Sequence, residues 1–126
     1  HEPVGAHGPV PILVGGNGPK VTWRLAARFA DELNLDSRTP AQVREALPVI
    51  RDRCEEIGRD PDTLSVSVHL WGPPADARPG TERIERLLEF AEVGLDRVIV
   101  QGFVGTTDPA ALDSLIEDCE ATGMLS

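Results

Sequence analysis

The chain has 126 residues, of which 40% are hydrophobic and 26% are charged, and this composition is typical of a folded domain rather than a disordered segment. Its 21 acidic and 12 basic residues give a net charge of −9, which argues against nucleic acid or an anionic membrane surface as a partner. No apolar run approaches the roughly 20 residues that a membrane-spanning helix needs, and no secretion leader is visible. We therefore expect one domain over residues 1–126.

The two cysteines, Cys54 and Cys119, lie far apart in the sequence and form no CxxC pair. Both fall on apolar helical positions, so we interpret them as buried thiols of a cytoplasmic protein, with a disulfide as the alternative. The chain opens with His1 rather than Met, as an internal piece of a longer protein would.

In chain order, the first quarter predicts an extended segment, a strand and a helix. Residues 1–11 are rich in Gly and Pro, and residues 11–14 (PILV) form a wholly apolar run that suits a strand buried on both faces. A Gly-rich turn at residues 15–18 follows, and the helix is expected to begin at Pro19. Its inner face would carry Val21, Leu25, Ala26 and Phe29.

The second strand–helix pair contains the clearest helix in the sequence. Residues 32–35 (ELNL) predict a short strand, and residues 39–42 (TPAQ) form a capping box with Pro at the first helical position. Gly58 is expected to cap the end of this helix, while Pro48 predicts a kink or a break. The inward-facing residues would be Val43, Leu47, Ile50, Cys54 and Ile57.

Two further strand–helix pairs follow. Residues 64–70 (LSVSVHL) alternate apolar and polar side chains, which indicates a strand, and residues 97–101 (RVIVQ) predict the last one. Thr81 can cap the third helix, and residues 108–109 (DP) open the fourth. The expected inner faces are Ile84, Leu87, Leu88 and Ala91 in the third helix, and Leu112, Leu115, Ile116 and Cys119 in the fourth.

Strand and helix therefore alternate four times, which defines the α/β class with a parallel sheet and right-handed crossovers. A closed (βα)8 barrel typically needs about 250 residues. The chain is thus expected to be either a small open α/β sheet or half of such a barrel.

In both architectures ligands bind beyond the carboxyl ends of the strands. The most informative segment there is the turn Gly15-Gly16-Asn17-Gly18, because glycines allow close approach of a ligand and the next helix begins with free N–H groups. A phosphate would fit these amides, and Lys20 adds a positive charge. A plain tight turn explains the spacing equally well, since neither a Walker A nor a GxGxxG pattern is present.

Four segments resemble the luciferase-like monooxygenase family, and most closely its branch of coenzyme F420-dependent oxidoreductases. They are residues 11–20 (PILVGGNGPK), 24–34 (RLAARFADELN), 53–61 (RCEEIGRDP) and 94–100 (GLDRVIV). The resemblance runs through the whole chain, and the first segment is its most specific part. Members of the family are (βα)8 barrels, so the chain is similar to their C-terminal half, the last four βα units.

The resemblance implies an oxidoreductase that moves a hydride between bound F420, with FMN as the alternative, and a small organic substrate. It implies that the backbone amides of the turn hold the cofactor phosphate, with Lys20 and Asn34 near the same site. The predicted cofactor-binding residues are Gly15, Gly16, Asn17, Gly18, Lys20 and Asn34. No catalytic residue is assigned, and no metal site is expected.

The family's N-terminal half, which carries much of the ring pocket, has no counterpart in this sequence. We therefore expect a homo-oligomer or a complementary N-terminal half-barrel chain to cover the open sheet edges. The alternative is a catalytically inactive half-barrel that acts as a structural or interaction subunit. With three Phe, two Trp and no Tyr, the chain also offers few rings for stacking a flavin.

Two further side chains near the strand ends carry alternative interpretations. His69 lies on the polar side of its strand with Ser65 and Ser67, where it is either a proton donor or a hydrogen-bonded histidine of the barrel interior or surface. Trp71 either flanks a ring or packs at the rim. His1 and His7 are expected to be solvated.

Overall fold

A computed structural model of the chain describes residues 8–71, 77–100 and 109–124. The strands in these ranges are β1 (Leu13–Gly15), β2 (Glu32–Asp36), β3 (Ser65–Leu70) and β4 (Arg97–Val100). The helices are α1 (Thr22–Phe29), α2 (Pro40–Glu55), α3 (Thr81–Glu92) and α4 (Pro109–Ala121), with a short 3-10 helix, η1, at Pro61–Thr63. The predictions for His1, His7, Gln101, Asp108 and the cores of the loops after β3 and β4 lie outside the described residues.

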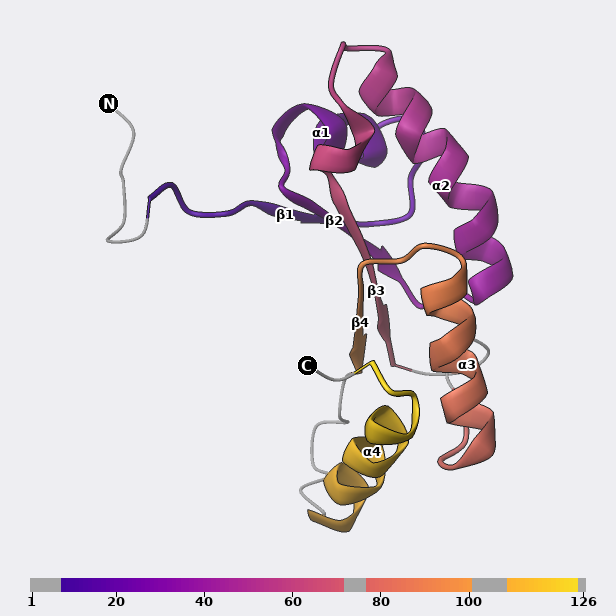
Figure 1. The fold of residues 1–126 in the computed structure, drawn as a ribbon. Coiled ribbons are helices and arrows are strands. Elements are labelled where there is room, and N and C mark those ends of the chain that lie inside the picture. Colours follow the sequence, from indigo (N-terminus) through magenta and orange to yellow (C-terminus); the bar gives the residue numbers. More distant parts are fainter. Residues whose placement is uncertain (1–7, 72–76, 101–108, 125–126) are drawn as a thin grey trace.

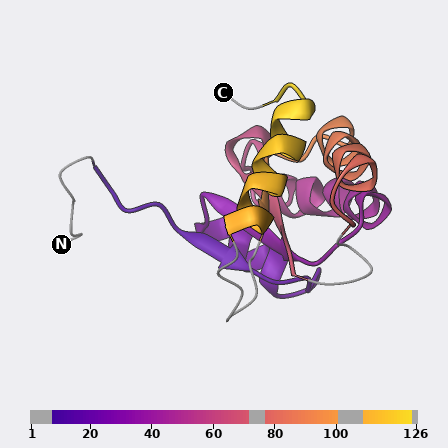
Figure 2. The ribbon, with the colours of Figure 1, turned by 90° about the horizontal axis from the view of Figure 1, so that it is seen from below.

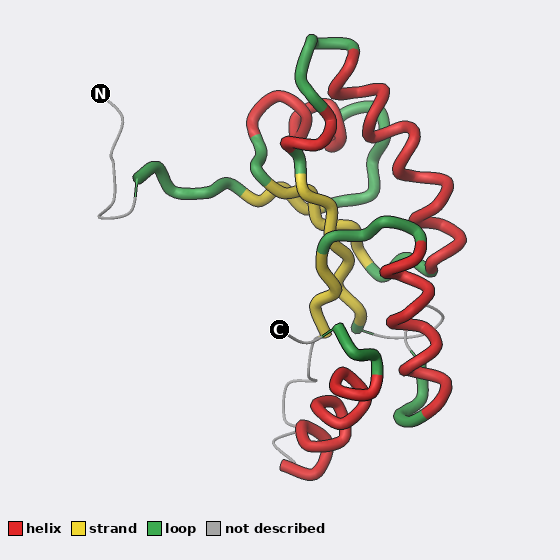
Figure 3. Tube along the Cα trace, viewed as in Figure 1, coloured by secondary structure: helices red, strands yellow, loops and turns green. Residues whose placement is uncertain are grey.

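The four strands form one parallel sheet in the order β1-β2-β3-β4, so each strand pairs with the next one along the chain. Strand and helix alternate throughout (Figure 3). This arrangement confirms the α/β fold class and the four βα units. In the register of the sheet, Asn34 of β2 lies opposite Gly15 of β1 and Ser67 of β3.

The alternation of side chains along the strands separates an apolar face from a polar face. On β2 and β3, the apolar core residues are Leu33, Leu35, Val66, Val68 and Leu70. They pack with buried residues of α1, α2 and α3, and helices α2 and α3 lie along the same side of the sheet in both ribbon views (Figures 1 and 2). The polar residues between them therefore lie on the other face.

Strand β1 differs from the prediction of a strand buried on both faces. Residues 8–12 lead into it as an extended segment (Figure 1), and Ile12 and Leu13 are about half exposed. Among the β1 residues, Val14 packs against the core. The reason is position, because β1 stands at the edge of the sheet and has a described neighbour on one side only, β2.

Helix α1 begins three residues later than expected, at Thr22, and turns a different face inward. Its buried residues are Trp23, Ala26 and Ala27, whereas Leu25 and Phe29 are about half exposed. Val21, which precedes the helix, is also exposed. The prediction is confirmed for Ala26 and wrong for Val21, Leu25 and Phe29, because α1 contacts α2 and the sheet through the face that carries Trp23, Ala26 and Ala27.

Helix α2 confirms the predicted capping box, in which Thr39 accepts a bond from the Gln42 amide and the Gln42 side chain accepts one from the Thr39 amide. Pro48 causes no break, because it lies on the exposed side of the helix and water can reach the freed carbonyl. Gly58 follows the helix with φ +74°, as a left-handed cap requires. Ile57 lies beyond the helix and is 54% exposed, so its predicted inward position was wrong.

In the later helices the predicted inner faces are confirmed only in part, with Leu87 buried as expected. Gly80 rather than Thr81 precedes the first turn of α3, with no side-chain cap, and the buried residues of α3 are Leu87 and Phe90. In α4, Leu112 and Ile116 are exposed, while Leu115 and Cys119 are partly buried. Leu88 and Ala91 are exposed as well.

Arg59 joins the first two βα units. Its guanidinium donates to the carbonyl oxygens of Ala27 and Ala30 at 3.0 and 2.8 Å, which caps the carboxyl end of α1, and to the Thr63 carbonyl oxygen at 3.0 Å. A cation at this end of a helix also meets the negative end of the helix dipole. None of the helices in the described ranges has the length and apolarity needed to span a bilayer.

Candidate cofactor and proton-transfer site

The Gly-rich turn after β1 is held tightly against the start of α1. Gly16 adopts φ +142°, its amide donates to the Asn34 carbonyl oxygen at 2.9 Å, and its own carbonyl oxygen accepts a bond from the Trp23 indole at 3.1 Å. A Cβ atom on Gly16 would lie 2.9 Å from Thr22 Cγ2, and one on Gly18 would lie 3.2 Å from Thr22 Oγ1. The close approach of Thr22 therefore explains why both positions are occupied by glycine.

The side chain of Asn17 fastens the turn to the end of β2. Its Nδ2 donates to the Asp36 carbonyl oxygen at 3.0 Å, and its Oδ1 accepts from the Asp36 amide at 2.9 Å. The side-chain amide thus pairs with both backbone groups of one residue. It is engaged within the protein, so only the backbone of Asn17 is available to a ligand.

The turn keeps donors available for an anion. Within the described ranges, the backbone amides of Asn17, Gly18 and Thr22 donate to no protein acceptor. They belong to the turn and to the first residue of α1, where the helix dipole also favours negative charge. Lys20 is exposed beside them and makes no ion pair in the described part of the chain. These groups fit a phosphate or a similar anion.

A continuous network of hydrogen bonds and ion-pair contacts crosses the polar face of the sheet, and we refer to it as the polar ladder. It runs through Arg97, Glu32, Ser67, Asn34, His69, Asp36 and Trp71. These residues come from β2, β3 and β4 and from the position after β3. The parallel register places them in a zigzag, because side chains two residues apart on one strand share a face with those of the next strand.

In the first half of the polar ladder the β2 and β3 side chains are buried, whereas the Arg97 side chain is 63% exposed. Arg97 donates to Glu32 Oε1 at 2.6 Å, and the Ser67 hydroxyl donates to Glu32 Oε2 at 2.8 Å. Asn34 Nδ2 donates to Ser67 Oγ at 2.9 Å. Glu32, Asn34 and Ser67 are each at most 7% exposed, so the carboxylate is a buried charge with both of its oxygens paired.

The second half reaches the surface at the carboxyl end of the sheet. His69 Nδ1 lies 2.7 Å from Asn34 Oδ1, and His69 Nε2 lies 3.3 Å from Asp36 Oδ1. The Trp71 indole donates to the same Asp36 oxygen at 2.6 Å. The His69 side chain is 29% exposed. The imidazole therefore lies at the surface, near the carboxyl end of β2 where Asn17 binds Asp36.

The residue after β2 is backbone-strained. Ser37 has φ +44° and is the one non-glycine residue with positive φ in the described ranges. Its hydroxyl is buried and has no partner there, although its amide donates to the His69 carbonyl oxygen at 2.9 Å. Strain of this kind is often kept next to functional groups.

The structure thus brings together five of the residues predicted from the sequence, near the carboxyl ends of β1 and β2. They are Gly15, Gly16, Asn17, Gly18 and Asn34. Lys20 lies beside the turn, and no contact between Lys20 and the polar ladder is present in the described residues. Asn34 is a link in the ladder, and Trp71 is a half-exposed rim residue bonded to Asp36.

Sequence reasoning missed Glu32, Asp36 and Arg97. A signal for the two acidic residues exists, because they alternate with Leu33 and Leu35 in the same way that the β3 serines alternate with valines. Arg97 gave no such signal, since its role depends on the register between β3 and β4.

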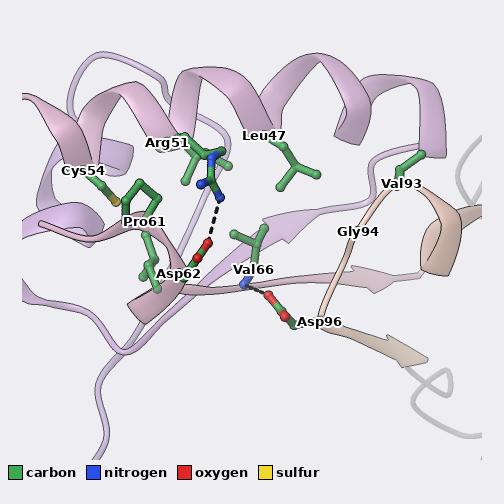
Figure 4. Close-up of a pocket in the computed structure, with 11 residues that line it drawn as sticks. Leu47, Arg51, Cys54, Pro61, Asp62, Val66, Val93, Gly94 and Asp96 are labelled. Carbon is green, nitrogen blue, oxygen red and sulfur yellow. Dashed lines mark hydrogen bonds and ion pairs between the residues drawn. The ribbon is translucent and has the colours of Figure 1, made fainter.

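A cavity of about 510 Å³ lies away from the Gly-rich turn. Residues of α2 line it together with residues at the starts of β3 and β4 (Figure 4). Cys54 lines it, and burial raises the pKa of this thiol, which keeps it protonated. Both cysteines are free thiols, as predicted. In the described ranges no three or more His, Cys, Asp or Glu side chains are grouped to hold a metal ion.

The described residues form a parallel α/β fold of four βα units, with the Gly-rich turn at the carboxyl end of β1. No known family model matches the sequence. The fold is similar to that of the coenzyme F420-dependent tetrahydromethanopterin reductase from Methanopyrus kandleri, with a TM-score of 0.67 and 14% identity over 86% of this chain and 50% of the reductase.

It is also similar to an F420-dependent secondary alcohol dehydrogenase, solved in complex with an F420–acetone adduct. The TM-score is 0.60 and the identity 17%, over 75% of this chain and 44% of the dehydrogenase. The chain therefore spans about half the length of the solved structures it matches. At these identities the likeness establishes the fold.

Proposed function

We propose that the chain forms the C-terminal half of an F420-dependent oxidoreductase of the luciferase-like type. The completed barrel would transfer a hydride between F420 and a small organic substrate, with FMN as the alternative cofactor. The proposal is supported by the fold likeness to two F420-dependent enzymes, combined with a turn of free amides at the carboxyl end of β1.

The residues of the turn fit the anionic part of such a cofactor. The amides of Asn17, Gly18 and Thr22 would hold its phosphate, and Lys20 would add a positive charge from the exposed side. When bound, the cofactor supplies the hydride chemistry, which no amino-acid side chain provides.

The other residues of the site hold this arrangement in place. Asn17 fixes the turn to Asp36, so the free amides keep their direction relative to β2. The polar ladder fixes the side chains on the neighbouring part of the sheet and places His69 at the exposed end. Rigid donors and a positioned titratable group are what hydride transfer to or from an organic substrate requires of the protein.

We further propose that a second set of four βα units completes the barrel, either from a complementary half-barrel or from a second copy of this chain. Leu13 on β1 and the segment Val21, Leu25 and Phe29 of the α1 region expose apolar side chains in both the strand layer and the helix layer. A neighbouring strand and helix would cover both at once. Uncovered, this edge exposes apolar surface and free backbone groups.

The proposal is tested by titrating the chain, alone and with its complementary half, with F420 and with FMN, and following binding by fluorescence and native mass spectrometry. We expect saturable binding of F420 in an assembly that contains eight βα units. Lys20→Glu should weaken this binding, because it replaces the exposed positive charge beside the turn with a negative one.

Arg28→Glu is the matched control, since it makes the same change of charge at the far end of α1. An equal loss of binding in both variants would mean that binding depends on the net charge of the chain and not on the charge beside the turn. A complete assembly that binds neither cofactor would reject the proposal in favour of a structural or interaction subunit.

A further inference from the structure

The polar ladder contains enough fixed donors and acceptors to determine where its protons lie. The Glu32 carboxylate accepts a charge-assisted hydrogen bond from Arg97 at 2.6 Å, and a carboxylate only accepts hydrogen bonds. The Ser67 hydroxyl has one proton, so this proton goes to Glu32 Oε2 at 2.8 Å.

The direction of the Ser67–Glu32 hydrogen bond determines the direction of the next one, between Asn34 and Ser67. Because the Ser67 proton is used, Ser67 Oγ can only accept from Asn34, and the atom that faces it at 2.9 Å is the NH2 group. This conclusion follows from the partners and does not depend on how the two amide atoms are labelled. The Asn34 oxygen is therefore the atom that faces His69 at 2.7 Å.

An amide oxygen accepts, so His69 Nδ1 must carry a proton. The exchangeable position of the ring is then Nε2, which lies 3.3 Å from Asp36 Oδ1. The register partner of His69 on β4 is Ile99, which is apolar, and the helices pack on the other face of the sheet. Asp36 is the charged group that faces this nitrogen in the described residues, and its Oδ1 also accepts the Trp71 indole.

We propose that Glu32, Ser67 and Asn34 are positioning residues that hold His69 with its proton on Nδ1, so that Nε2 is the atom at which the site accepts and returns a proton from a substrate oxygen. The O–H bond of the substrate breaks as the N–H bond at Nε2 forms, and the electron pair stays on the oxygen. The Asp36 carboxylate offsets the charge of the resulting imidazolium. The identity of the proton's partner, an organic substrate, rests on the proposed function.

The arrangement favours the less usual tautomer of the neutral His69 ring. A neutral imidazole next to a carboxylate would ordinarily place its proton on the nitrogen that faces the carboxylate, which here is Nε2. The polar ladder imposes the opposite tautomer. Removing the Ser67 hydroxyl frees the Asn34 amide to rotate, so the neutral ring should then move its proton from Nδ1 to Nε2.

The experiment is nuclear magnetic resonance of the full chain with isotope-labelled histidine, with the His69 signals assigned by comparison with His69→Gln. In the wild-type chain we expect the neutral ring to carry its proton on Nδ1. In Ser67→Ala we expect the protonated-nitrogen signal of the neutral ring to move to Nε2. Ser65→Ala is the matched control, because Ser65 is an exposed serine on the same side of the same strand.

Glu32→Gln provides a second variant that does not depend on the first. A glutamine amide can donate as well as accept, so Ser67 no longer has a fixed direction and the Nδ1 proton should again be lost from the neutral ring. A wild-type ring whose neutral form carries its proton on Nε2 would overturn the inference. So would a Ser67→Ala spectrum identical to that of the wild type.

F420 binding separates this inference from the proposed function. The amides of the turn are untouched by Ser67→Ala, so the variant should bind F420 as the wild type does while its tautomer changes. Failure of every variant and of the wild type to bind F420 would count against the proposed function and leave the proton positions as measured.

Discussion

At the scale of single residues, the most informative side chain is Asn17. The sequence suggested a ligand contact, whereas the structure uses the side chain as a clamp across the ends of two strands. The free amides of the turn depend on this clamp for their position. The Asn17 side chain therefore has a structural role that is separate from the proposed role of its backbone amide.

We expect Asn17→Ala to destabilise the chain by about 1–3 kcal/mol, because the Asp36 amide and carbonyl lose their partners in a half-buried position. Urea unfolding measures the change. Lys20→Ala is the control, and its effect should stay within about 0.5 kcal/mol because Lys20 is exposed. Equal midpoints for the two variants would show that the clamp does not contribute.

Ser37 offers a second prediction at this scale. Positive φ at a non-glycine residue costs on the order of 1 kcal/mol, so Ser37→Gly should raise the free energy of unfolding by up to about that amount. Ser37→Ala removes the unpartnered hydroxyl and keeps the strained backbone. If the alanine variant gains as much as the glycine variant, the hydroxyl and not the backbone is the source of the strain.

At the scale of elements, the strands and helices could be predicted because each is encoded locally. The capping box of α2, the alternation of β3 and the glycines after α2 and α3 carry their own signals. The buried face of α1 could not be predicted, because it depends on how closely α2 packs against it. Of the residues predicted to face inward, Ala26 is buried, but Leu25 and Phe29 are exposed and Trp23 and Ala27 are buried in their place.

In the site, too, the local features could be predicted and those that depend on the sheet register could not. The Gly-rich turn was visible in the sequence, since glycines and a following helix are local features. The polar ladder was not, because a single sequence does not give the register that places Glu32 and Asn34 beside Ser67. Period-two alternation on β2 would have revealed a polar face, but not its partners.

Helices α3 and α4 are joined by a carboxylate, which leads to a prediction about pH. Asp118 accepts the Gly80 amide at 2.9 Å and the Arg83 guanidinium at 2.6 Å. The Gly80 bond first, and then Arg83, lower the pKa of Asp118 against the opposing effect of burial. A carboxyl whose pKa is lowered by folding stabilises the folded state above its ordinary pKa, and this contribution is lost as the pH falls through the lowered value.

Asp118→Asn should therefore be less stable than the wild type at neutral pH, and the difference should shrink as the pH falls below the ordinary range of an aspartate. Urea unfolding of both chains over a series of pH values measures it. Asp113→Asn, an exposed position of the same helix, is the control. A difference that stays constant down to the most acidic pH would contradict the role of the ionised form.

At the scale of the whole molecule, the half-barrel exposes apolar side chains at the β1 edge. Leu25 and Phe29 point away from the core on α1, and Leu13 is half exposed on β1. The sequence indicated open edges in general, from the number of βα units. Which side chains are exposed there became clear only from the packing of α1.

We expect the isolated chain to self-associate through this edge, and Phe29→Glu to shift it toward the monomer in analytical ultracentrifugation. The introduced charge opposes the burial of the apolar segment. Ala41→Glu adds the same charge at an exposed position of α2 and should leave the association unchanged. A wild-type chain that stays monomeric at high concentration would show that the edge does not bind a second copy.

The strand order has a consequence for how the molecule forms. Neighbouring strands of the sheet are consecutive along the chain, and each helix contacts mainly the helix before or after it. Such local connectivity favours rapid folding, because few long loops must close before contacts form. During synthesis, each emerging βα unit would find its docking surface already present on the unit before it, so the sheet could grow in the order in which the ribosome releases it.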